Sequence, residues 1–205
     1  MSDHDLTKLA GTFDKVARYF DLMRPLFTGP YRRAAEYALD RLVATGSSPS
    51  LLDIGTGTGT LAGALAARGA KVTGVDISRG MLEQARKKYG RQVHFIQAPA
   101  HAPGPFDDDS FDMVSAAFAL HEMPADYRAR VLGEMKRLAR QKVLIIDYIP
   151  NSNPVIALVE QLEKSYYRQF LFEIDNQLKN FFNGYEKKKL NHFMGLYLCD
   201  AGVRR

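Results

Sequence analysis

The feature that most constrains the fold of this chain is a glycine loop at residues 51–60, with the sequence LLDIGTGTGT. An apolar run leads into the loop, glycines alternate with threonines along it, and a helix-forming segment, LAGALAARGA, follows it. Glycine is needed where a backbone turns sharply or approaches a ligand closely, and the start of a helix offers free N–H groups and a positive dipole end. The pattern predicts a strand, a ligand-binding loop and a helix.

Strand-like and helix-like segments alternate downstream of this loop. The strands are expected at 71–76, 93–97, 111–117 and 142–148, and the helices between and after them at 79–89 and 125–139. Helices placed between strands indicate repeated right-handed βαβ crossovers and a parallel sheet that is covered on both faces. We expect an α/β fold, a doubly wound Rossmann-like sheet with strand order 3-2-1-4-5.

Both ends of the chain are expected to be helical. Two amphipathic helices, over 12–23 and 31–43, precede the first strand, because Pro25 stops the first and Gly29-Pro30 starts the second. An aromatic-rich helical pattern covers 154–182, and a final helix is expected over about 185–201. The expected organisation is one domain, 1–205, made of an N-terminal helical lid (1–48), a cofactor-binding core (49–150) and a helical C-terminal segment (151–205).

Composition narrows the class of protein. No segment approaches the roughly 18 uninterrupted apolar residues of a membrane span, and the N-terminus lacks an apolar signal core, so we expect a cytoplasmic protein without stable membrane insertion. A single cysteine, Cys199, excludes a disulfide framework and multi-cysteine metal sites, and no metal is expected. The net charge of +5 comes from scattered Lys and Arg, so a solvated helix face explains them and no nucleic-acid partner is expected.

The spacing of the glycines discriminates between ligands. A dinucleotide-binding fingerprint is G-x-G-x-x-G, whereas this loop has Thr60 where the last glycine should stand. At the end of the second expected strand, Asp76 is placed to accept hydrogen bonds from ribose hydroxyls. An adenosine-containing ligand is therefore indicated, and the hypothesis of a nicotinamide cofactor is disfavoured.

Three motifs resemble the class I S-adenosylmethionine-dependent methyltransferases, over about residues 12–150. They are LLDIGTGTG at the loop, VDIS after the second strand and PFDDDSFDMV at the fourth. Within that group, FDKVARYFDLM and PFDDDSFD are similar to the small-molecule (methyltransferase type 11) enzymes, which include the ubiquinone and menaquinone biosynthesis methyltransferases. The resemblance implies S-adenosyl-L-methionine as cofactor and a small-molecule acceptor.

The resemblance also implies which residues bind the cofactor. The backbone of the glycine loop would hold the methionine part, the carboxylate of Asp53 its ammonium group or the loop itself, and Asp76 the ribose. One departure is Pro99, which stands where many relatives have an aspartate for the adenine amino group, so backbone groups near Ala100 and His101 would substitute. The cofactor residues implied are Asp53, Gly55, Thr56, Gly57, Gly59, Asp76, Ile77, Met81, Ala100 and Phe118.

The methyl acceptor is expected at the loop after the fourth strand, because ligands of doubly wound sheets cross the carboxyl ends of the strands at the switch point. That loop carries Phe118, His121 and Glu122. His121 has the pKa class of a general base for an acidic O–H, C–H or N–H nucleophile, although a turn-capping role explains it as well. Aromatic residues of the two terminal segments, among them Tyr19, Tyr31 and Tyr166, are expected to line an apolar acceptor pocket.

The C-terminus is a second departure from the family pattern. Relatives continue into two further antiparallel strands, which this chain is expected to lack. The fifth strand would then be an exposed apolar edge, so we expect either a helix packed over it or a homodimer formed through that edge or the C-terminal helices.

Three functions compete. The leading hypothesis is an S-adenosylmethionine-dependent methyltransferase (EC 2.1.1) that acts on a small apolar or aromatic acceptor by in-line displacement. The alternatives are a catalytically weak or inactive cofactor-binding module of the same fold and a nicotinamide-dependent oxidoreductase.

Overall fold

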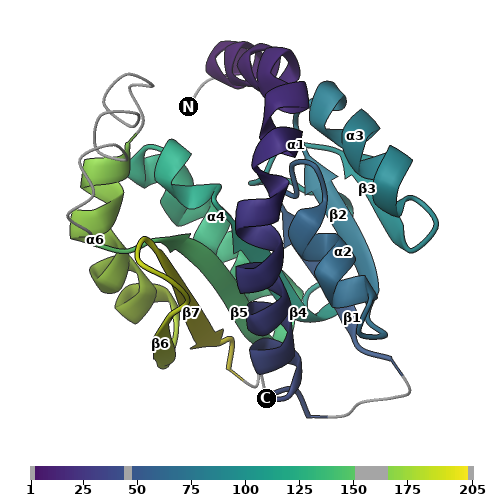
Figure 1. Cartoon of the computed structure of the whole chain (residues 1–205). Helices are drawn as coiled ribbons and strands as arrows, with labels where there is room; N and C mark the ends of the chain where they lie inside the picture. Colours follow the sequence, from purple (N-terminus) through teal and green to yellow (C-terminus); the bar gives the residue numbers. More distant parts are fainter. Residues whose placement is uncertain (1–2, 44–47, 151–165, 203–205) are drawn as a thin grey trace.

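The computed structural model of the chain describes residues 3–43, 48–150 and 166–202. Figure 1 shows a central twisted sheet with helices on both of its faces. In chain order the elements are α1 (Asp3–Leu39), β1 (Ser50–Ile54), α2 (Thr60–Ala66), β2 (Lys71–Asp76), α3 (Arg79–Tyr89), β3 (Val93–Gln97), β4 (Phe111–Ala117), the 3₁₀ turn η1 (Leu120–Glu122), α4 (Ala125–Leu138), β5 (Ala139–Tyr148), α6 (Tyr167–Phe181), β6 (Tyr185–Lys189) and β7 (Met194–Asp200).

The sheet has the order β3-β2-β1-β4-β5-β7-β6. Strands β1 to β5 are parallel to one another, and β7 runs antiparallel to both β5 and β6. The order 3-2-1-4-5 and the doubly wound architecture are therefore confirmed. The strand order reverses between β1 and β4, and this is the switch point at which such folds bind ligands.

Alternate residues of each strand feed two separate hydrophobic layers. On β1, Leu51 packs with residues of α1, α2 and α3, whereas Leu52 and Ile54 pack with residues of α4 and α6. Figure 1 shows the same division, with α1, α2 and α3 over one face of the sheet and α4 and α6 over the other. Burial on both faces explains why these strands are almost continuously apolar.

The N-terminal segment differs from the expectation of two helices. It forms one helix, α1, which passes through both Pro25 and Pro30. Each proline removes one helical hydrogen bond, but its fixed φ is compatible with a helix. The buried alanines Ala34, Ala35 and Ala38 belong to the hydrophobic layer that α1 shares with α2 and α3, and this packing favours a continuous helix.

The prediction that the last two strands are missing is wrong, as is the helix expected over 185–201. Residues 185–200 form the hairpin β6–β7, and all residues of β7 except Asp200 are buried. Asn191 closes the turn, since its side-chain oxygen accepts hydrogen bonds from the N–H groups of Phe193 (3.0 Å) and Met194 (2.8 Å). The helical periodicity of this segment is overridden because an apolar run can pair with the free edge of β5.

The hairpin removes one reason to expect a homodimer. Strand β7 pairs with β5 from Lys142 to Tyr148, so the apolar edge of β5 is covered within the chain. The new outer strand, β6, carries Glu186 and exposed lysines, and such charges discourage pairing with a second sheet. Of the expected C-terminal helices, α6 lies within 154–182, whereas residues 151–165 lie outside the described part of the chain.

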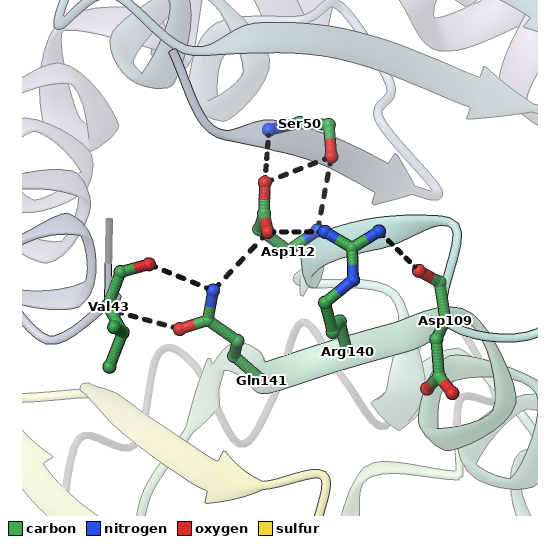
Figure 2. A network of polar contacts seen from close by, with 6 residues as sticks. All are labelled: Val43, Ser50, Asp109, Asp112, Arg140 and Gln141. Atoms are coloured by element: carbon green, nitrogen blue, oxygen red, sulfur yellow. Dashed lines mark hydrogen bonds and ion pairs between the residues drawn. The ribbon is translucent and has the colours of Figure 1, made fainter. Parts of the chain in front are cut away.

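A polar network fastens the amino ends of the central strands (Figure 2). The carboxylate of Asp112 on β4 accepts hydrogen bonds from the N–H (2.9 Å) and hydroxyl (3.1 Å) of Ser50, and it pairs with Arg140 at 2.8 Å. Gln141 bonds Asp112 and, on its other side, the backbone of Val43. This network holds β1, β4 and β5 in register at the edge opposite the glycine loop.

Candidate functional site

The glycine loop between β1 and α2 adopts backbone angles that favour glycine. The φ values of Gly55, Gly57 and Gly59 are +66°, +53° and +78°, all in the left-handed region. A Cβ added to Gly59 would lie 3.1 Å from atoms of Ala85, so this glycine allows α2 and α3 to pack closely. A Cβ added to Gly57 would meet no protein atom within 4 Å, so this glycine leaves space beside the loop.

Asp53 lies beneath the loop and is almost completely buried. Its carboxylate accepts hydrogen bonds from the hydroxyls of Thr56 (2.7 Å) and Ser115 (2.6 Å), which tie the loop to β4. Burial raises the pKa of Asp53 to about 6, against the lowering effect of these hydrogen bonds. A carboxylate in this environment is favoured further by a cation placed beside it.

Asp76, at the end of β2, bonds two segments beside the switch point. One oxygen accepts a hydrogen bond from the N–H of Gly57 and the other from the N–H of Ser78, each at 2.8 Å. Burial raises the pKa of Asp76, and the backbone donors partly oppose this effect. The glycine loop and the start of α3 are thus joined through one side chain.

The loop after β4 begins at a strained residue. Phe118 has φ of +51°, which is uncommon for an aromatic residue, and its N–H donates to the carbonyl of Ile146 at 2.8 Å. A Cβ on Gly55 would lie 2.8 Å from the Cβ of Ala119, so this loop contacts the glycine loop directly. The sharp turn places η1 beside the switch point.

His121, on η1, lies in a buried charged triad. Its Nδ1 lies 2.7 Å from Asp147 Oδ1 and its Nε2 lies 3.2 Å from Glu122 Oε1. Burial by itself would lower the pKa of His121, but the two carboxylates together raise it to about 10. The imidazole is therefore protonated at neutral pH.

A cavity lies between the glycine loop, the loop after β4 and α1. Its lining combines the glycine loop, Asp53 and Asp76 with aromatic and apolar side chains from α1 and from the loop after β4. Helix α1 runs along the face of the sheet that also carries α2 and α3 (Figure 1), and its side chains form part of the cavity wall. The side chains that α1 contributes are Leu6, Leu9, Phe13, Arg24, Phe27 and Tyr31.

Asp14 attaches α1 to the start of α3, beside the cavity. Its Oδ1 accepts hydrogen bonds from the hydroxyl of Ser78 (2.5 Å) and the N–H of Gly80 (2.8 Å), at the N-terminus of α3. A carboxylate at a helix N-terminus is stabilised by the helix dipole as well as by the free N–H groups. The covering helix is thereby anchored next to Asp76.

We expect the substitution Asp14→Ala to loosen α1. Loss of this cap should cost about 1 kcal/mol of unfolding free energy and should make trypsin cleavage after Lys15 several-fold faster. Limited proteolysis followed by mass spectrometry measures the change. Asp40→Ala, an exposed residue beyond the C-terminal end of α1, is the control. Cleavage of the Asp14 variant at the wild-type rate would contradict the anchoring role.

Comparisons with known proteins agree with this geometry. A model of the methyltransferase domain family matches residues 51–142. The demethylmenaquinone methyltransferase of Thermus thermophilus is 34% identical over 159 residues, which are 72% of this chain and 69% of that protein. The demethylmenaquinone methyltransferase of Clavibacter sepedonicus is 34% identical over 165 residues, which are 77% of this chain. The chain spans 65% of the length of the Clavibacter protein.

The chain belongs to the class I S-adenosylmethionine-dependent methyltransferases. The structure of magnesium protoporphyrin IX methyltransferase from Synechocystis, with bound S-adenosylhomocysteine, has a TM-score of 0.59 at 19% identity. The match covers 83% of each chain, and at this identity it shows the shared fold alone. The motifs at 51–59, 75–78 and 105–114, on which the resemblance rested, lie at β1 and the glycine loop, at the end of β2, and at the start of β4.

The structure brings most of the residues predicted to bind the cofactor to one cavity. Gly59 is the exception, because it does not line the cavity and packs against α3 instead. The residues of this set that do line it are Asp53, Gly55, Thr56, Gly57, Asp76, Ile77, Met81, Ala100 and Phe118.

The residues predicted to contact the acceptor are dispersed. Tyr31 is buried and lines the cavity. Tyr166 precedes α6, is 43% exposed and does not line the cavity. The side chain of Tyr19 lies outside the described part of the methyltransferase. His121 is near the cavity but enclosed behind it, with Glu122 on the cavity side.

Three features of the site were missed by sequence reasoning. Asp14 is an ordinary helix-surface residue by its periodicity, Phe27 follows the proline at which the first helix was expected to end, and Tyr127 occurs in a helical pattern. Tyr127 lines the cavity, and its hydroxyl lies 3.0 Å from His101 Nδ1. The sequence motifs and their spacing predict the residues near the glycine loop, but they carry no information about which side chains of the covering helices face the cavity.

Within residues 3–43, 48–150 and 166–202, no three His, Cys, Asp or Glu side chains gather as a metal-binding group. Over the same described ranges, no helix combines the length and apolar character needed to cross a bilayer.

Proposed function

We propose that this protein transfers a methyl group from S-adenosyl-L-methionine to a small apolar or aromatic acceptor. The observation that carries the proposal is a cavity lined by an open glycine loop, by the buried Asp53 and the half-buried Asp76, and by aromatic side chains. S-adenosylmethionine, a cation that also carries ribose and a carboxylate, matches the polar part of this lining.

The residues around the glycine loop fit the parts of the cofactor. Asp76, Ile77 and Met81 line the cavity; Asp76 would accept hydrogen bonds from the ribose hydroxyls, and Ile77 and Met81 would flank the adenine. Asp53 would face the ammonium group or hold the loop through Thr56, and the open space beside Gly57 suits the methionine part. The elevated pKa values of both aspartates favour a cationic ligand, because a nearby positive charge stabilises their ionised forms.

The aromatic part of the lining supports an apolar or aromatic acceptor. The ring of Phe118 packs edge-on against Phe27 at 5.3 Å and against Tyr148 at 4.9 Å between centroids. Burial is the main cause that raises the pKa of Tyr31 well above its ordinary value, so its hydroxyl stays neutral. Such a surface can enclose a planar ring and exclude water. The demethylmenaquinone methyltransferases among the relatives make a quinone-like ring the first acceptor class to examine.

The cofactor would supply a methyl group on a sulfonium, which an acceptor takes by in-line displacement. The contribution of the protein is then to orient the acceptor, to hold it against the cofactor side and to remove water, and these effects can account for most of the acceleration. A cytoplasmic location and a homodimer through the C-terminal helices stay predictions of the sequence.

Isothermal titration with S-adenosylmethionine and with NAD tests the cofactor, and the expected result is saturable binding of the first alone. Incubation with tritiated S-adenosylmethionine and the small-molecule fraction of a bacterial extract then tests transfer, and we expect label in an organic-extractable product. Tight binding without any labelled product would favour an inactive cofactor-binding module. Binding of NAD alone would overturn the proposal.

A further inference from the structure

A carboxylate of η1 faces the cavity, and it is not the residue that the sequence singled out as a base. Glu122 lines the cavity together with Phe118 and Met123, at the carboxyl end of β4. Its Oε1 contacts the Nε2 of His121 at 3.2 Å, and its side chain is 21% exposed. Glu122 therefore has access both to the cavity and to a buried cation.

His121 is unsuited to accept a proton. The side chain is 6% exposed, and both ring nitrogens are engaged by carboxylates. The rings of Tyr148 and Phe170 pack against it, with centroids at 4.8 and 6.4 Å. Because the raised pKa leaves the imidazole protonated at neutral pH, it has no free lone pair to act as a base.

Asp147 holds His121 from the side away from the cavity. Its side chain is fully buried, and besides Nδ1 it accepts hydrogen bonds from the N–H groups of His121 (3.3 Å) and Tyr148 (2.8 Å). These contacts hold the imidazolium in one orientation, in which Nε2 lies 3.2 Å from Glu122 Oε1. The charged and titratable groups around the triad are Arg128 of α4, whose charge interacts with Asp147, and the cavity-lining Arg24, Tyr31, Asp53, Asp76 and Tyr127.

We propose that Glu122 is the catalytic base of this site and that His121 and Asp147 are positioning residues that orient its carboxylate. This inference rests on the proposed function. In the step, the acceptor forms a bond to the methyl carbon as the bond from that carbon to sulfur breaks. The acceptor proton passes to the carboxylate of Glu122 and from there to solvent, and S-adenosylhomocysteine is the neutral-sulfur product.

The decisive variant is Glu122→Gln, which keeps the shape of the side chain and its place beside His121 but cannot accept the proton. With tritiated S-adenosylmethionine and the extract fraction described above, we expect transfer about 100-fold slower than wild type at pH 7. Affinity for S-adenosylmethionine by calorimetry and the melting temperature should be unchanged, and Glu122→Asp should recover part of the rate. Glu83→Gln, an exposed glutamate on α3, is the matched control and should transfer at the wild-type rate.

A second readout does not depend on turnover. Imidazole resonances of His121, assigned by comparison with His121→Gln, should report a protonated ring at pH 8 in wild type and a neutral ring in Asp147→Asn. A neutral His121 at pH 7 in wild type, or a Glu122→Gln variant that retains more than half of the wild-type rate, would overturn the inference. Absence of transfer by the wild-type protein would instead overturn the proposed function, and this inference with it.

Discussion

Replacement of Gly57 by valine is expected to abolish measurable binding of S-adenosylmethionine. Gly57 has a left-handed φ of +53°, which a β-branched residue adopts only at a cost, and it lines the cavity with no protein atom near its missing Cβ. Two methyl groups would occupy the open space beside the loop, and the strained backbone would displace the N–H that bonds Asp76. We expect a loss of affinity of at least about 100-fold by isothermal titration, or roughly 3 kcal/mol.

The matched control is Gly69→Val, in the turn after α2. Gly69 also has a left-handed φ, +90°, and open space around its missing Cβ, but it does not line the cavity. Both variants should lose a similar amount of unfolding free energy, about 1–2 kcal/mol, because the backbone strain is the same in kind. Only Gly57→Val should lose cofactor affinity. Normal affinity in that variant would refute the assignment of the loop to the cofactor.

Replacement of Arg128 by methionine is expected to destabilise strongly the layer of the protein that α4 and α6 form. Arg128 is fully buried on α4 and donates to the side chains of Gln177 (2.6 Å) and Glu173 (2.7 Å) on α6. It also donates to the carbonyl of Met123 at 2.9 Å, directly after η1. Removing the guanidinium leaves three acceptors without their partner.

We expect Arg128→Met to lower the free energy of unfolding by about 3 kcal/mol, which is at the lower end for a broken buried ion pair. The loss is at this end because the side chain of Glu173 is 30% exposed and can be partly hydrated. Thermal unfolding should report a decrease of roughly 10 °C in melting temperature for a chain of this size. Arg130→Met is the control on the same helix, since Arg130 is exposed and lies over the ring of Tyr127 at 5.1 Å. Surface substitutions usually change the free energy of unfolding by no more than about 0.5 kcal/mol. A smaller change than this for Arg128→Met would contradict a structural role of the guanidinium.

The double variant Arg128→Met with Glu173→Gln separates two explanations. If the cost comes from the unpaired carboxylate, neutralising Glu173 should restore part of the stability, and the two changes should not add. Since Arg128 also fixes the carbonyl after η1, the single variant should lower methyl transfer more than it lowers affinity for S-adenosylmethionine. If methyl transfer and affinity for S-adenosylmethionine fell by the same factor, the cause would be global unfolding of the variant.

Much of the central sheet was predictable because its signals are local. The strands at 71–76, 93–97 and 111–117 and the helix at 79–89 have the expected bounds. Their apolar runs are bounded by turns rich in glycine, proline and acidic residues, so the hydrophobic periodicity and the turn residues predict the same boundaries. The cofactor side of the cavity was predictable for the same reason, since the glycine loop and Asp76 belong to short motifs with fixed spacing.

The ends of the chain were not predictable in this way. Residues 185–200 have an apolar pattern that a helix or a strand could satisfy, and the presence of an unpaired edge on β5 decided for a strand. The two prolines of α1 indicated a break, but burial of its alanine face against the α2 and α3 layer kept the helix continuous. Both outcomes depend on partners distant in the sequence.

The sequence by itself determined the order of the parallel strands, the open loop at Gly57 and the position of Asp76, because each follows from residue types a few positions apart. Tertiary structure alone decided that Gly59 serves packing, that Asp14 caps a helix 64 residues away, and that His121 is a buried cation with Glu122 toward the cavity. The physical reason is that desolvation, charge pairing and close packing depend on which side chains meet in space. The spacing of residues along the chain does not encode those encounters.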